Sequence, residues 1–251
     1  MRFLGSCLAP GEYVTPQNRQ PTNSPPTSHA HEEQQAAIIP NAPVPPPCFP
    51  ARSLVSFLNM KLYLLSCQNI HQYAKQILPL LPEQRRLAYV RNGSPLSLGA
   101  GLLLASLLKV HSDDDLRYGP QGKPFLAAGG PEFNLSHSKE HVLLGVSHGP
   151  IGVDMERADR PVSPTLKKWV CLPWEKEFPF LTVYTRKECA MKLTGLGFSL
   201  PLNEIDTTRE YAWDGAAYHF LSTTCDGYVI SVLSTEEILP EIQRLQPEEL
   251  L

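Results

Sequence analysis

The chain has 251 residues, of which 42% are hydrophobic and 19% are charged, and these proportions are typical of globular proteins. Twenty-two basic and twenty-five acidic residues leave a formal net charge of -3, which excludes a general electrostatic attraction for nucleic acid or an anionic membrane. The six cysteines include no C-x-x-C pair. Neither a disulfide framework nor a cysteine zinc site is therefore indicated, and we expect a cytoplasmic location.

Residues 1–59 form a segment rich in proline, glutamine, serine and threonine, with three prolines in succession at 45–47. The segment lacks sustained apolar periodicity and cannot bury enough surface to offset the entropy of the chain, so we expect a disordered extension. Met60 opens the first strand-like stretch and is an alternative start, so the extension is either a tail or a start-site artefact. The longest apolar run, 96–110, is too short for a membrane helix of ~20 residues.

The rest of the chain predicts alternating strands and helices. In chain order we expect a strand at 60–65, one or two helices within 72–91, an apolar helix at 98–110 and a loop at 119–124. Two strands follow at 142–146 and 151–155, with a turn between them, and then a helix at 181–194 that ends at Gly195. The last two strands, at 218–224 and 228–233, flank Asp226-Gly227. Residues 142–147 and 229–234 resemble one another faintly, which suggests a duplicated α+β half.

Two carboxylates, Asp154 and Glu156, are separated by one residue within a predicted strand. Residues two apart on a strand face the same side, with Cα atoms roughly 6.5 to 7 Å apart, so both side chains could reach one cation. On the later helix, Glu188 and Lys192 are one turn apart and share a face. Magnesium takes a few carboxylates together with water and substrate phosphate oxygens, so this set suits a phosphoanhydride substrate.

Each of these features also has a simpler interpretation. Glu188 and Lys192 could be a surface ion pair, and Asp154 and Glu156 could lie at a solvated strand end. The residues that precede them could belong to ordinary turns: Ser136 and His137 to one with a hydrogen-bonded imidazole, and Lys123 to an exposed one.

A second metal hypothesis comes from residues 137–141, which spell H-x-x-E-H. This is the zinc-binding pattern of inverted metallopeptidases, in which one helix presents both histidines. Because the segment runs into a strand-like stretch, we do not expect a helix there.

Four stretches in order resemble the 4'-phosphopantetheinyl transferase superfamily, and the resemblance covers about residues 60–234. They are residues 122–124 (GKP), 133–138 (FNLSHS), 151–156 (IGVDME) and 187–195 (KECAMKLTG), and residues 197–202 (GFSLPL) continue the pattern. The resemblance implies transfer of phosphopantetheine from coenzyme A to a serine of an apo acyl or peptidyl carrier protein, with release of 3',5'-ADP and with magnesium on the pyrophosphate.

The resemblance also implies roles for individual residues. Asp154, Glu156 and Glu188 would hold magnesium, with Glu188 placed to take the serine proton directly or through water, and Lys192 would stabilise or protonate the departing phosphate. Ser136 and His137 would hold the 3'-phosphate of coenzyme A, and Lys123 another part of the nucleotide.

The chain departs from the family pattern in three places. Tyr184 stands where the family usually has tryptophan. Residues 95–97 (PLS) occupy the place of basic residues that bind coenzyme phosphates, which leaves Arg91, with Arg85 and Arg86, as substitutes. The connection from Glu156 to Glu188 is short for a member of the family. Within this connection, residues 167–174 include two lysines and two tryptophans. The tryptophans either belong to the core or form, with the lysines, a surface for an acidic helix of the carrier protein.

We therefore predict an α+β protein of the larger, pseudo-dimeric type, with two similar α/β halves related by a pseudo-two-fold. The halves are residues 60–150 and 151–251, the second carrying the magnesium site, and the active site lies in the cleft between them. Proteins of this type with both halves in one chain are generally monomers. The alternative function is that of a degenerate relative which binds coenzyme A or a carrier protein without turnover.

Overall fold

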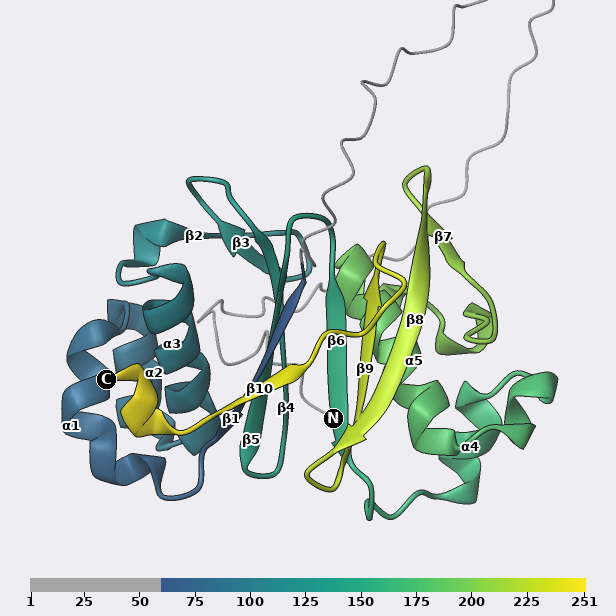
Figure 1. Ribbon diagram of the computed structural model, residues 1–251, viewed down its shortest axis with the longest axis horizontal. Coiled ribbons are helices and arrows are strands. Elements are labelled where there is room, and N and C mark those ends of the chain that lie inside the picture. Colours follow the sequence, from purple (N-terminus) through teal and green to yellow (C-terminus); the bar gives the residue numbers. More distant parts are fainter. Residues whose placement is uncertain (1–59) are drawn as a thin grey trace, which may run out of the picture. The chain divides into compact units, whose positions relative to one another are not determined.

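The computed structural model describes residues 60–251, and the predicted disordered extension lies outside the described residues. A first sheet contains four strands in the order β10-β1-β5-β4. Its strands are β1 (Lys61–Ser66), β4 (Glu132–Ser138), β5 (His141–Ser147) and β10 (Ile242–Leu245). β1 pairs with β10 in parallel, and the other neighbours are antiparallel. The end of the chain thus returns to the sheet that begins it (Figure 1).

A second sheet has the order β6-β9-β8-β7, with antiparallel neighbours throughout. Its strands are β6 (Gly152–Arg157), β7 (Tyr211–Trp213), β8 (Ala216–Cys225) and β9 (Tyr228–Ser234). A separate pair joins β2 (Leu116–Tyr118) to β3 (Pro124–Leu126). The turn between β8 and β9 confirms the predicted hairpin, because Asp226 and Gly227 both have positive φ, as a two-residue turn matched to strand twist requires.

Five α-helices lie within the described residues, and short 3-10 turns connect many of the elements. The helices are α1 (Ala74–Ile77), α2 (Glu83–Asn92), α3 (Pro95–Leu108), α4 (Pro164–Val170) and α5 (Phe180–Thr194). The 3-10 turns are η2 (Ile70–Tyr73), η3 (Leu78–Leu80), η4 (Asp113–Asp115), η5 (Pro173–Glu177), η6 (Gly197–Ser199), η7 (Leu202–Glu204) and η8 (Pro247–Leu250). None of the helices in residues 60–251 has the length and apolar character needed to cross a membrane.

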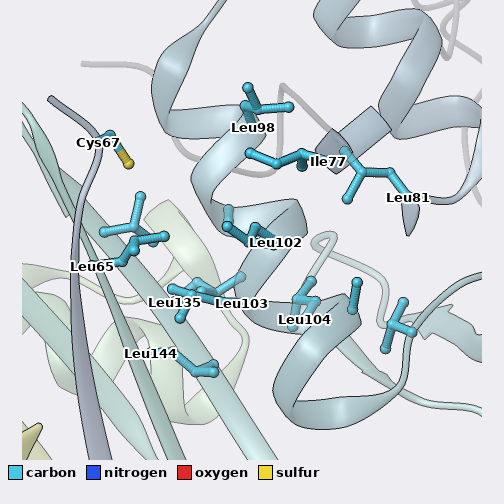
Figure 2. Packing of buried hydrophobic residues seen from close by; sticks show 14 of the residues in the cluster. Leu65, Cys67, Ile77, Leu81, Leu98, Leu102, Leu103, Leu104, Leu135 and Leu144 are labelled. Carbon is cyan, nitrogen blue, oxygen red and sulfur yellow. The ribbon is translucent and has the colours of Figure 1, made fainter. Parts of the chain in front are cut away.

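Helix α3 forms the core of the first half because it is apolar around most of its circumference. Ser94 caps its first turn by accepting a hydrogen bond from the Ser97 amide. Leu103 faces Leu135 and Leu144 of the first sheet, while Leu98 lies beside Ile77 of α1 (Figure 2). Helix α3 also contacts η2 and η3. Burial of each such leucine stabilises the fold by about 1.5 to 3 kcal/mol, so α3 anchors both the sheet and the shorter helices.

Helix α5 covers the second sheet and approaches β6 closely at Gly152. A Cβ atom at this position would lie 2.1 Å from the Cys189 carbonyl oxygen, so only glycine allows the helix backbone to come this near the strand. The contact lies one residue from Glu188 and two from Asp154. Gly195 ends the helix in a left-handed conformation with φ 68, as predicted from the sequence.

The two sheets share a topology. In each half a strand is followed by a long helix and then by a hairpin, and the order of the three strands is β1-β5-β4 in one half and β6-β9-β8 in the other. The faintly similar segments 142–147 and 229–234 fall on β5 and β9, which hold equivalent places in these orders. The common topology is consistent with a duplicated α+β unit.

The structure corrects the sequence prediction in two respects. Residues 132–138 form the strand β4, so the interpretation of Ser136 and His137 as turn residues is wrong. The predicted strands at 142–146 and 151–155 exist as β5 and β6, but they do not pair with each other. They belong to different sheets, because the turn between them carries the chain from one half to the other.

Candidate functional site

The candidate site lies where the edge strands β4 and β6 run side by side and α5 crosses β6 (Figure 1). Asp154 is buried near the middle of β6. Its Oδ1 atom accepts a hydrogen bond of 2.8 Å from the Ser136 hydroxyl of β4 and another of 2.6 Å from the Lys192 ammonium of α5. Three elements from both halves therefore meet at one carboxylate.

Lys192 has two partners on β6, since its Nζ atom also donates to the Val153 carbonyl at 3.1 Å. Burial alone would lower the pKa of this ammonium, but the charges of Asp154 and Glu188 outweigh burial and raise the pKa. The predicted placement of Lys192 beside acidic groups is thereby confirmed, and its interpretation as half of a surface pair is wrong.

Glu188 lies one turn before Lys192 on the same helix and is largely buried. Burial, followed by the charge of Asp154, raises the pKa of the Glu188 carboxyl to about 7. The Tyr184 hydroxyl donates a hydrogen bond to it, and the charge of Glu156 also acts on it. A carboxyl group with a pKa near neutrality can exchange a proton at physiological pH, as a general base requires.

Glu156 carries its charge at the more open end of β6. It forms a short ion pair with Arg160 and accepts a hydrogen bond of 3.1 Å from the Ser138 hydroxyl. Burial raises the pKa of Glu156, and Arg160 opposes that rise. The Arg160 guanidinium also lies over the Tyr184 ring at 5.2 Å.

The three carboxylates form one electrostatic cluster, but each has its own partner. Lys192 contacts Asp154, Arg160 contacts Glu156, and Tyr184 contacts Glu188. Over residues 60–251, no three His, Cys, Asp or Glu side chains are arranged to hold a metal ion. In donor type and charge the cluster still fits a hard divalent cation, because mutual repulsion disfavours ionisation of Glu188 and a cation would relieve it.

Two further predicted site residues, His137 and Lys123, lie on elements next to this cluster. His137 is half-buried on β4, and burial, followed by the charge of Lys192, lowers the pKa of its imidazole. Lys123 donates to the Leu193 carbonyl at 2.8 Å and so caps the C-terminal end of α5.

Arg91 lies on the exposed surface of α2, where its guanidinium bonds to the Leu87 carbonyl of the same helix. Within residues 60–251 it makes no hydrogen bond or ion pair with β4, β6 or α5. The structure thus brings Asp154, Glu188 and Lys192 together, while Arg91 stays outside the cluster.

The H-x-x-E-H hypothesis of a zinc metallopeptidase is wrong. His137 and His141 lie on β4 and β5, on either side of a tight turn in which Lys139 has φ 53. The His141 Nδ1 atom lies 3.1 Å from the Tyr228 hydroxyl, on the second sheet. A zinc site of this class needs both imidazoles on one helix face, and the hairpin excludes that arrangement.

Two features of the site region were missed from the sequence. Arg160 follows Glu156 by four residues, a spacing that gives no signal outside a helix. The other is a buried ion pair between Lys187 and Glu175, whose Nζ and Oε2 atoms are 2.6 Å apart. Lys187 adjoins Glu188 in the sequence, but it faces away from the cluster toward η5.

The connection between Glu156 and Glu188 carries an exposed aromatic surface. Trp169 on α4 is 77% exposed and Trp174 on η5 is 52% exposed, so the interpretation of both as core residues is wrong. Phe178 is also exposed, and the intervening Val170 is buried. Helix α4 thus attaches through its apolar side and presents a tryptophan to solvent, next to Lys167 and Lys168.

A curated protein of Synechocystis sp., provisionally named a 4'-phosphopantetheinyl transferase, is 36% identical to this chain over 104 residues. The match supports the phosphopantetheinyl transferase superfamily. It covers 35% of this chain and 42% of the relative, so the chain spans less than half the length of the protein it matches. No family model matches the chain.

Proposed function

We propose that this protein is a magnesium-dependent 4'-phosphopantetheinyl transferase. It transfers the phosphopantetheine group of coenzyme A to a serine of an apo acyl or peptidyl carrier protein and releases 3',5'-ADP. The observation that carries the proposal is the meeting of Asp154 from β6 with Glu188 and Lys192 from α5. The partial match to a named transferase supports the same chemistry.

In this proposal Asp154, Glu156 and Glu188 would hold the magnesium ion, which when bound neutralises pyrophosphate oxygens. The ammonium of Lys192 is a fixed positive charge 2.6 Å from Asp154, suited to stabilise the negative charge of the departing 3',5'-ADP. Glu188 would take the proton of the attacking serine, directly or through water. The serine oxygen bonds to the phosphorus of the pantetheine phosphate as the pyrophosphate P–O bond breaks.

The basic groups available for coenzyme A are sparse. Lys123, in the loop before β3, donates to the carbonyl of Leu193, the residue of α5 that follows Lys192. Its ammonium has two further donors for a phosphate. Arg160 is the other cation at the edge of the cluster. It would be free to meet a phosphate if a metal ion replaced it on Glu156, and it takes over the role that the sequence suggested for Arg91.

The carrier protein would dock on the exposed surface of α4 and η5. Trp169 and Trp174 supply large apolar contacts, and Lys167 and Lys168 supply positive charge that suits an acidic helix. This surface lies in the connection that joins β6 to α5, the two elements that carry the cluster. We further propose that the chain is of the larger, pseudo-dimeric type and acts as a monomer.

Intact-mass analysis tests the function. Purified protein is incubated with coenzyme A, magnesium and several apo carrier proteins, and we expect the mass of one phosphopantetheine on at least one carrier. Asp154→Ala should abolish the adduct, while Asp159→Ala, an exposed aspartate of the following loop paired with Arg157, should retain it. Absence of an adduct with every carrier, or full activity in Asp154→Ala, would contradict the proposal.

The second candidate is a relative that binds coenzyme A or a carrier without turnover. It is favoured by two observations: each of the three carboxylates has its own partner, and no group of three acidic, His or Cys side chains in residues 60–251 is arranged to hold a metal ion. Titration calorimetry separates the two candidates. Binding of coenzyme A without transfer, unaffected by Glu188→Gln, would support the non-catalytic alternative.

A further inference from the structure

The edge strands β4 and β6 belong to different sheets, yet side chains of β4 take the place of a backbone ladder between them. An edge strand presents every second amide to its open side. On β6 these are the amides of Val153, Met155 and Arg157, and each donates to a side chain of β4. The two halves of the molecule are thereby joined along this line by side chains.

The three acceptors on β4 are two residues apart and face the same side of the strand. The Asn134 side-chain oxygen accepts from Val153 at 2.9 Å, the Ser136 hydroxyl from Met155 at 3.3 Å, and the Ser138 hydroxyl from Arg157 at 3.3 Å. Asn134 and Ser136 are buried, where an unpaired amide would cost about 1 to 3 kcal/mol.

Two of these three side chains also hold the acidic groups of the candidate site. The Ser136 hydroxyl donates to Asp154 Oδ1 at 2.8 Å, and the Ser138 hydroxyl donates to Glu156 Oε2 at 3.1 Å. A serine hydroxyl has a single proton, so in each case that proton is directed at a carboxylate. Asn134 contacts only the backbone of β6.

We propose that Ser136 and Ser138 are positioning residues that fix the carboxylates of Asp154 and Glu156 for a divalent cation, and that Ser136 is not a contact for the 3'-phosphate of coenzyme A. The proposal rests on the assignment of these carboxylates to magnesium. Ser136 is 2% exposed, and its proton would have to leave Asp154 to reach a phosphate. Hydrogen bonds to ligating carboxylates commonly change metal affinity by about 10- to 100-fold.

Metal affinity in the absence of any coenzyme or carrier is the first test, with Mn²⁺ alone as the probe and electron paramagnetic resonance as the readout. We expect Ser136→Ala and Ser138→Ala each to weaken Mn²⁺ binding by about tenfold or more. Ser136→Thr and Ser138→Thr, which keep the hydroxyl, should restore most of the affinity.

Asn134→Ala is the matched control, because it removes a bond of the same ladder without touching a carboxylate. We expect this variant to lose stability but to keep its Mn²⁺ affinity within about threefold. Amide exchange at Met155 should accelerate in Ser136→Ala, and exchange at Val153 in Asn134→Ala, which verifies that each variant is folded and has lost the intended bond.

The pattern of outcomes separates this inference from the proposed function. Wild-type protein that fails to bind Mn²⁺ would overturn the metal assignment and this inference with it. If wild-type protein binds Mn²⁺ and both serine variants bind it with unchanged affinity, the positioning role of the serines is overturned. The proposed function is not affected by that outcome.

A second test uses 3'-dephospho-coenzyme A, which lacks the phosphate in question. If Ser136 positions Asp154, Ser136→Ala should lower kcat by the same factor with coenzyme A and with the dephospho compound. An effect confined to KM for coenzyme A, and absent with the dephospho compound, would show a direct phosphate contact and contradict the proposal.

Discussion

Lys187 and Glu175 form an ion pair of 2.6 Å in which both side chains are completely buried. The Lys187 ammonium also donates to the carbonyls of Val170 and Leu202, at 2.8 and 3.0 Å. The Lys187 ammonium thus ties α5 to η5, to the C-terminal end of α4 and to η7. Because the next residue of α5 is Glu188, this buried pair contributes to the orientation of the helix that carries the candidate site.

Replacing one partner of this pair should strongly destabilise the fold. We expect Lys187→Met to lower the free energy of unfolding by about 3 to 5 kcal/mol, since Glu175 would keep an unpaired charge in the interior. The double variant Lys187→Met/Glu175→Gln should recover part of that loss, and denaturant titration measures both. The exposed pair of Arg157 and Asp159 is the control, and its disruption should cost less than about 1 kcal/mol.

The raised pKa of Glu188 predicts a dependence of stability on pH. Its carboxyl titrates near 7 in the folded protein and near 4.5 when unperturbed, so the folded state is progressively disfavoured as pH rises from 4.5 through 7. Relative to wild type, Glu188→Gln should therefore gain on the order of 1 to 3 kcal/mol between pH 4.5 and 8. Unfolding titrations in EDTA at several pH values measure this gain.

The exposed Glu140, in the turn between β4 and β5, provides the control for that experiment. Glu140→Gln removes one exposed carboxylate and so measures the effect of losing a single negative charge. A difference between Glu188→Gln and wild type that stays constant with pH would show that Glu188 has an ordinary carboxyl pKa.

The close contact of α5 with β6 should not tolerate a side chain at Gly152. Since the obstructing atom is the backbone oxygen of Cys189, 2.1 Å from the added Cβ, the helix itself must move. We expect Gly152→Ala to destabilise the protein by more than about 2 kcal/mol and to weaken Mn²⁺ binding. In Gly149→Ala the nearest atom is 3.9 Å away, so this variant should match wild type in both measurements.

The exposed tryptophan of α4 should serve recognition and not stability. Trp169→Ala should change the free energy of unfolding by less than about 0.5 kcal/mol, because the side chain is 77% exposed. It should raise KM for the apo carrier by about fivefold or more while leaving KM for coenzyme A unchanged. Ile238→Ala, at another exposed apolar residue, should change neither KM, and an equal effect of both substitutions would argue against a carrier surface on α4.

Elements with strong local signals were predictable from the sequence. The continuous apolar run of α3, the ending of α5 at Gly195, and the hairpin at Asp226-Gly227 depend on neighbouring residues alone, and the structure confirms all three. The strand β4 was missed because its alternate residues Ser136 and Ser138 are polar. They face a second strand edge and not solvent, a placement that periodicity cannot reveal.

The composition of the site could be predicted, but the partners of its groups could not. The spacing of Glu188 and Lys192 on one helix placed both on a common face, and the structure confirms that they approach Asp154. No sequence pattern indicates that Ser136 bonds to Asp154 or that Arg160 pairs with Glu156. Those contacts depend on where β4, β6 and α5 come to lie against one another.

The local elements and the chemical groups that this protein carries follow from the sequence, because backbone conformation and helical or strand periodicity act over a few residues. Which of these groups meet depends on the tertiary structure. The packing of α5 on β6 at Gly152 and the side-chain ladder between β4 and β6 set those distances, and burial then raised the pKa of Glu188. Distance and desolvation depend on contacts between residues far apart in the chain, and they decide what the acidic cluster can do.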